Sequence, residues 1–130
     1  MKRDPGAGPT QRQRRVAEEL RHRLAEAFLR TEFRDPDLFG VDLTVAEVRM
    51  SPDLRHATVF VSRLGDQDID KLIPALGRAA PFLRGIVGRG LRLKFTPDLH
   101  FLPDHAIDEA TRINEILHLP DVRRDLDHDD

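Results

Sequence analysis

The chain has 130 residues, of which 39% are hydrophobic and 34% are charged, so it is long enough for one small domain with loose ends. Its formal net charge of −2 conceals an acidic carboxyl-terminal region, where residues 98–130 contain ten acidic residues and three arginines. It has no cysteine, which excludes disulfides and thiolate chemistry, and neither a signal segment nor an apolar run of the roughly 18 residues that span a membrane, so we expect a cytoplasmic protein.

The first predicted element is a helix over residues 12–31. It follows residues 1–11, which are rich in Gly and Pro, lack periodicity and are expected to form a basic disordered tail. Thr10 or Gln11 is the expected start of the helix. Apolar side chains then recur at every fourth position, at Val16, Leu20, Leu24 and Phe28.

Three arginines, Arg12, Arg14 and Arg15, lie at the start of this helix. The helix macrodipole disfavours cations at that end, so local stability does not explain them. Two explanations remain open: the arginines contact phosphate groups, or they form part of a solvated arm.

Residues 41–62 are predicted to form an antiparallel hairpin with its turn at residues 51–54. Apolar and polar residues alternate in the first strand, and the apolar phase changes in a way that predicts a bulge between Val45 and Val48. The second strand directs Ala57, Val59 and Val61 to one face. We expect the opposite face of the sheet to stay solvated.

Residues 71–94 carry six cations and no acidic residue: Lys71, Arg78, Arg84, Arg89, Arg92 and Lys94. Apolar residues recur at helical spacing over residues 72–87, but Pro81 falls in the middle of the pattern. Proline lacks the backbone N–H and disfavours a helical conformation in the residue before it. The pattern therefore predicts two helical segments that meet at a joint formed by Ala79, Ala80 and Pro81.

A third strand is predicted at residues 91–95, with Leu91, Leu93 and Phe95 pointing inward and Arg92 and Lys94 pointing outward. Thr96 and Pro97 interrupt this strand, which can resume and run to Pro103.

A last helix is predicted over residues 106–118, and residues 119–130 form an acidic tail too polar to pack. Residues 12–118 would therefore make one α+β domain, with a three-stranded sheet and helices on one of its faces.

Catalysis is not indicated by any motif. The sequence contains no nucleophile motif, P-loop or dinucleotide fingerprint, so we expect a protein without enzymatic activity or cofactor. The six histidines lack metal-ligand spacing, and His100 and His105 give only a weak indication of zinc. Gly85 and Gly88 match the GxxG loop of KH domains, but Ile86 and Val87 between them continue the apolar face of a helix. We therefore interpret Gly88 as a helix end.

The cations after residue 77 give a stronger indication. Arg78, Arg84, Arg89, Arg92 and Lys94 are expected to form a continuous positive strip along the joint and the third strand. Such strips bind phosphate groups, and the absence of acidic residues favours RNA over a merely solvated basic face.

The sequence resembles the ribosome-binding factor A family over residues 12–117. The resemblance rests on the segments RVAEELRHRLAEAF, SPDLRHATVFVS, AAPFLRGIVGRGLRLKFTPDLHF and IDEATRINEIL. It implies a type II KH-like fold in which an Ala-x-Gly kink between two helices replaces the GxxG loop. That kink corresponds to Ala79, Ala80 and Pro81, so proline stands where the family has glycine.

The resemblance also implies a function. The family consists of non-enzymatic, cytoplasmic assembly factors that bind the small (30S) ribosomal subunit and its 16S rRNA. They support late maturation, including processing of the rRNA 5′ end, are linked to growth in the cold, and leave the particle with the help of a GTPase. A monomer is expected. The alternative from another class is a protein-interaction module that uses the solvated sheet face or the acidic tail, with incidental RNA binding.

Overall fold

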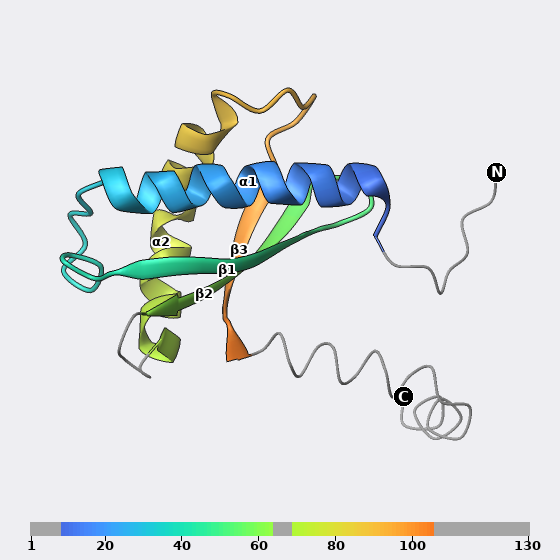
Figure 1. Cartoon of the computed structure of the whole chain (residues 1–130). Coiled ribbons are helices and arrows are strands. Elements are labelled where there is room, and N and C mark those ends of the chain that lie inside the picture. The colour runs from blue at the N-terminus through green and yellow to red at the C-terminus, as the bar shows by residue number, and fades with distance from the viewer. Residues whose placement is uncertain (1–8, 64–68, 106–130) are drawn as a thin grey trace, which may run out of the picture.

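The computed structural model describes residues 9–63 and 69–105, in which two helices and three strands follow in the order α1–β1–β2–α2–β3 (Figure 1). The elements are α1 (Gln11–Arg30), β1 (Leu43–Met50), β2 (His56–Arg63), α2 (Ile69–Gly88) and β3 (Asp98–Pro103). This confirms the predicted α+β class. The helix predicted over residues 106–118 and the acidic tail lie outside the described residues.

The start of α1 is fixed by a reciprocal cap. The Gln13 backbone N–H donates to Thr10 Oγ1 at 3.1 Å, and the Thr10 backbone N–H donates to Gln13 Oε1 at 2.8 Å. The Gln13 amide group also donates to the backbone carbonyl of Met50 at 3.1 Å. The first turn of α1 is therefore attached to the end of β1.

The three strands form one sheet in the order β1–β2–β3. β1 and β2 make the predicted antiparallel hairpin, and their register shifts between Val45 and Glu47, which confirms the predicted bulge. β3 pairs with β2 in parallel, so α2 forms the crossover between them.

The third strand lies later in the chain than its strongest predicted part. Residues 91–95 form no strand, and β3 covers only the segment that was expected to resume after Pro97. The ladder begins where the Asp98 backbone N–H donates to the Arg55 carbonyl at 2.8 Å, because Pro97 has no N–H to donate. Leu91 and Leu93 still pack against the core, so the alternation of apolar and polar residues here reflects the burial of side chains from a loop. Phe95, predicted to point inward, is 47% exposed.

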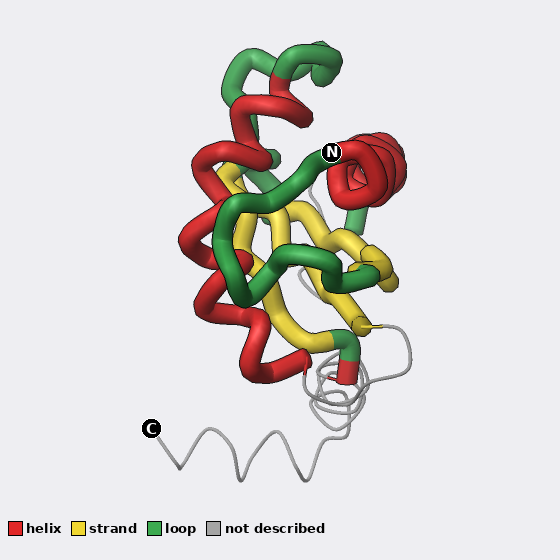
Figure 2. The backbone as a smooth tube through the Cα atoms, turned by 90° about the vertical axis from the view of Figure 1, so that its left-hand side faces the viewer, coloured by secondary structure: helices red, strands yellow, loops and turns green. Residues whose placement is uncertain are grey.

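The predicted joint in the second helical region needs a correction as well. α2 is a single helix of 20 residues that contains both Pro74 and Pro81. Figure 2 shows its path bowed outward, away from the strands. Pro81 removes only the hydrogen bond to the carbonyl of Gly77, and the apolar side chains on either side of it pack into the core, so the helix bends without ending. Gly88 ends the helix, as predicted.

One apolar core joins both helices to one face of the sheet, with α1 against β1 and α2 against β3. Ala57, Val59 and Val61 are fully buried in it, as predicted. The opposite face exposes His56 and His100, but Phe60 on that face is only 3% exposed. The expectation that this whole face is solvated is therefore wrong at Phe60, over whose ring Arg49 lies with Cζ 5.2 Å from the centroid.

Candidate nucleic-acid interface

Arg78, the first cation of the predicted strip, is held by two carboxylates of the loop between α1 and β1. Its Nε donates to Asp35 at 2.9 Å and its Nη2 donates to Asp37 at 3.0 Å. The hydrogen bond from Arg78 lowers the pKa of Asp35, and the Asp37 backbone N–H lowers it further. Arg78 therefore links a loop to α2, and its charge is largely compensated.

Arg84 lies on a different side of α2, since six residues along a helix turn the side chain by about 120° from its starting direction. Its guanidinium group donates to the Thr96 carbonyl at 2.8 and 3.2 Å and lies 3.3 Å from an Asp98 carboxylate oxygen. Arg78 and Arg84 thus contact different segments of the chain, and they do not form one strip.

Residues 89–95 leave α2 and run along α1 towards its first turn. The loop starts beside the middle of α1, where the Arg23 side chain donates to the Gly90 carbonyl at 3.0 Å. Arg89, Arg92 and Lys94 are exposed along this path. Within residues 9–63 and 69–105, no hydrogen bond or ion pair involves the side chains of Arg89 and Arg92, so both guanidinium groups can bind an external anion.

The loop brings the end of the acid-free region, residues 71–94, beside the arginines at the start of α1. Arg12 of α1 and Lys94 line one cleft of about 200 Å³, which is closed by the β1–β2 turn at Pro52, Asp53 and Leu54. The amino-terminal arginines and the end of the acid-free region were separate predictions, and the fold places them together.

An exposed aromatic ring lies in the same cleft. Arg55 covers the ring of Phe95, with Cζ 4.3 Å from the ring centroid, and Lys94 Nζ is 5.6 Å from it. Asp53 fixes Arg55 by accepting its backbone N–H at 3.1 Å. The Ser51 hydroxyl and this N–H both lower the pKa of Asp53, so its carboxylate is charged near neutral pH.

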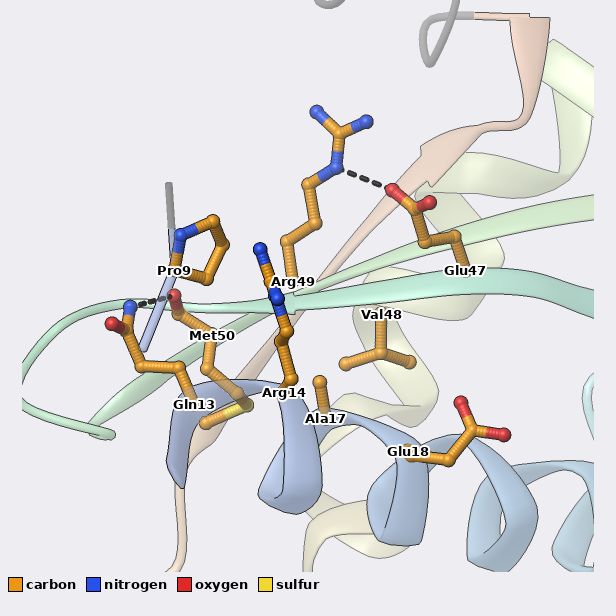
Figure 3. Close-up of a pocket in the computed structure, with 9 residues that line it drawn as sticks. All are labelled: Pro9, Gln13, Arg14, Ala17, Glu18, Glu47, Val48, Arg49 and Met50. Carbon is orange, nitrogen blue, oxygen red and sulfur yellow. Dashed lines mark hydrogen bonds and ion pairs between the residues drawn. The ribbon is translucent and has the colours of Figure 1, made fainter. Parts of the chain in front are cut away.

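A second cleft, of about 490 Å³, lies on the β1 side of the first turns of α1 (Figure 3). Arg14 projects from α1 toward β1 here, and Arg49 and Glu47 extend from β1 away from the helix, joined by an ion pair (Figure 3). Arg15 is exposed on the same turn of α1.

The cations around the first turns of α1 lie on more than one side of the helix, and we term them together the amino-terminal basic surface: Arg12, Arg14, Arg15, Arg49, Arg55 and Lys94. Arg49, Arg55 and Phe95 were not predicted as part of a site. The attachment of β1 to the first turn of α1 places Arg49 there, whereas the pairing of β2 with β3 and the path of residues 89–95 bring Arg55 and Phe95 together. The phosphate-binding role of the surface remains a prediction.

The motif Ala79, Ala80 and Pro81 lies elsewhere, in the middle of α2. Ala79 lines a cleft of about 700 Å³ together with Arg78, Phe82 and the segment that follows α1, residues 31–35. Phe82 is 57% exposed at this cleft. The motif is therefore accessible at its own site, separate from the amino-terminal basic surface.

Histidine residues do not build a metal centre in the described ranges, where no group of three or more potential ligands comes together. His56 Nδ1 lies 3.1 Å from His100 Nε2 across β2 and β3. His105 instead lies 3.5 Å from Asp70. Neither described helix, α1 or α2, is both long and apolar enough to cross a membrane.

The described part of the chain thus defines a small α+β protein whose cations gather where the start of α1 meets the sheet. A family model described as ribosome-binding factor A matches residues 12–117. The chain belongs to the ribosome-binding factor A family.

Relatives in this family are similar over most of their length. The ribosome-binding factor A of Phenylobacterium zucineum is 52% identical over 124 residues, which cover 95% of this chain and 86% of the relative. That of Paramagnetospirillum magneticum is 54% identical over 120 residues, covering 92% of this chain and 84% of the relative.

Solved structures agree with the fold. The crystal structure of ribosome-binding factor A from Thermus thermophilus superposes with a TM-score of 0.59 at 32% identity, covering 72% of this chain and 97% of the other. A homology model of the Thermus thermophilus protein, fitted into a cryo-electron microscopy map of its complex with the 30S subunit, gives a TM-score of 0.56 at 30% identity. It covers 72% of this chain and 96% of the other.

Proposed function

We propose that this chain is an assembly factor that binds the small ribosomal subunit by contacting rRNA phosphates with its amino-terminal basic surface. Family membership supports the ribosomal role, as does the Thermus thermophilus relative fitted into a map of a 30S complex. Binding to a phosphate backbone requires several cations on one surface, whatever the net charge of the chain.

One observation carries the choice of surface: Arg12 and Lys94, far apart in the sequence, line the same cleft. The side chains of Arg12, Arg14 and Arg15 have no hydrogen bond or ion pair within the described ranges, and no acidic residue occupies the first turn of α1. Cations at that position oppose the helix macrodipole, and a phosphate ligand would offset this cost by placing negative charge at the helix start.

The finer parts of the proposal follow the family. The protein acts without catalysis in late maturation of the 30S subunit, including 5′-end processing of 16S rRNA. It works as a cytoplasmic monomer, and a ribosome-assembly GTPase acts on the same particle. The maturation step is tested by measuring the amount of 16S rRNA precursor in cells that lack the protein. The precursor should accumulate relative to wild-type cells.

Charge reversal tests the surface. We expect the double variant Arg12→Glu and Lys94→Glu to lose co-sedimentation with small subunits near physiological salt, with a shallower dependence of the affinity on salt. Arg30→Glu is the matched control, because Arg30 is an exposed arginine at the opposite end of α1 and lies outside both candidate clefts. If the double variant binds like the wild type at every salt concentration, this surface is not the anchor.

A second candidate function is the docking of a protein on the cleft beside Ala79 and Phe82. The exposure of Phe82 favours it. Phe82→Ser would then reduce binding to the complete particle and leave binding to naked 16S rRNA unchanged, whereas rRNA binding alone predicts no effect on either.

A further inference from the structure

We propose that the cleft at Phe95 binds one unpaired RNA nucleotide, whose base stacks on Phe95 and whose phosphates contact Arg12, Arg55 and Lys94. This inference rests on the proposed function and adds the form of RNA that the surface recognises. We term these four residues the Phe95 cluster.

The ring is placed for stacking from outside the protein. Leu91 and Leu93 of the same loop pack against the core, but Phe95 keeps 47% of its surface exposed. Arg55 lies over part of the ring, with Cζ 4.3 Å from its centroid, so an aromatic ring and a guanidinium group lie together beside the cleft. Bases of single-stranded nucleic acids stack on both kinds of surface.

Three cations from three segments lie at the cleft or at its ring. Arg12 of α1 and Lys94 of the loop before β3 line the cleft with Phe95, and Arg55, from the end of the β1–β2 turn, lies over the ring. Among the described residues that line the cleft, Asp53 is the one carboxylate, and it already accepts from the Ser51 hydroxyl at 2.6 Å and from the Arg55 backbone N–H. Cations therefore outnumber the acid, and the sugar–phosphate backbone on either side of a stacked base would meet positive charge.

The site is also pre-organised. Arg55 donates its backbone N–H to Asp53 and accepts from the Asp98 backbone N–H at 2.8 Å, so its backbone is fixed on both sides. A backbone already held in place loses little conformational freedom on binding.

The size and openness of the cleft select an unpaired base. Bases within a duplex stack on each other and offer no free face, whereas bulged, looped or terminal nucleotides do. A cleft of about 200 Å³ at the surface has room for a single base, but a duplex can only contact its cationic rim. The cluster should therefore discriminate between strand forms, which a purely cationic surface would not do.

The test uses the full chain and two end-labelled RNA probes, an unstructured ten-nucleotide strand of mixed sequence and a ten-base-pair duplex, in fluorescence anisotropy titrations. Phe95→Leu keeps an apolar side chain and removes the aromatic face. It should weaken binding of the single strand about 5- to 100-fold and leave the salt dependence and duplex binding unchanged. Phe82→Leu is the matched control, an exposed phenylalanine on α2 that should have no effect on either probe.

Other outcomes would overturn the stacking site, and some of them leave the proposed function intact. Equal loss of single-strand and duplex binding by Phe95→Leu, or no loss at all, would overturn the stacking site. If wild-type protein co-sediments with small subunits while Phe95→Leu binds the single strand normally, only the stacking site falls. If the wild type binds neither small subunits nor the single strand, both proposals fall. Equal thermal melting of Phe95→Leu and wild type confirms that the variant is folded.

Discussion

Arg78 and Asp35 are joined across 43 positions of the sequence by a hydrogen bond of 2.9 Å between Nε and Oδ2. The same guanidinium group reaches Asp37, so one side chain of α2 holds the loop that leads from α1 to β1. An arginine that the sequence places in an acid-free region thus has its acidic partners in another segment. Its role in the fold is to fix a loop.

The first prediction separates this arginine from the binding surface. Arg78→Met should lower the melting temperature slightly, because the ion pairs are exposed and screened by solvent, and should leave affinity for small subunits unchanged. Arg12→Met should leave the melting temperature unchanged, since Arg12 has no ion pair within the described ranges, and should lower the affinity for small subunits. Thermal melting and co-sedimentation of both variants check this, and a loss of subunit affinity in Arg78→Met would return Arg78 to the interface.

The second prediction concerns pH. The pKa of Asp35 is lowered from its ordinary value of 3.8, first by the hydrogen bond from Arg78. A carboxyl group with a lowered pKa in the folded state contributes stability that is present above pH 3.8 and is lost as the pH falls through the folded-state pKa. Asp35→Asn should therefore melt below the wild type near neutral pH, and the difference should shrink in acid. A constant difference at all pH values would contradict this origin.

The third prediction concerns Pro81, which is exposed within a continuous helix. Pro81→Ala restores an N–H for the Gly77 carbonyl and replaces the poorest helix former, so it should raise the free energy of unfolding by about 1–3 kcal/mol. Gly77→Ala is the control for propensity alone, because an added Cβ there meets no atom within 4 Å, and it should contribute about 1 kcal/mol. Urea unfolding measures both, and a destabilised Pro81→Ala would show that the bow in α2 is required by its packing.

The fourth prediction concerns Gln13, which is only 6% exposed. Gln13→Leu removes its hydrogen bonds to Thr10 and Met50 and leaves the Met50 carbonyl without this donor, at a cost of about 2 kcal/mol. Thr10→Ala removes the cap alone, at about 1 kcal/mol. Urea unfolding should rank the two variants in that order, and equal values would mean that the bond to β1 adds nothing.

Local patterns in the sequence predicted much of the fold. The helix start at Thr10 or Gln11, the bulge between Val45 and Val48 and the helix end at Gly88 depend on neighbouring residues, and all three occur as predicted. The prediction of a strand at residues 91–95 was wrong, because an alternation of apolar residues indicates only which side chains are buried. The predicted break at Pro81 does not occur, because the core contacts of Leu76 and Leu83 on either side of it outweigh local propensity.

The candidate site was less predictable than the fold. The sequence indicated the exposed arginines at the start of α1 and those at the end of the acid-free region. It could not show that Arg78 and Arg84 are engaged by Asp35 and Asp98, since these partners are brought in by tertiary structure. The position of Arg55 over Phe95 follows from strand pairing, which no spacing within either segment contains.

The parallel pairing of β2 with β3 has a consequence for how the protein is made. His56 and His100 meet across 44 positions of sequence, whereas the β1–β2 hairpin closes through a short turn. Long-range pairing closes a larger loop at a greater entropic cost, so we expect β3 to join the sheet after the hairpin, when α2 has already been synthesised. Arg12 and Arg55 emerge early in synthesis, but the cleft they share with Phe95 exists only once β3 has docked. A nascent chain therefore gains the cleft that we propose to bind RNA only as its fold is completed.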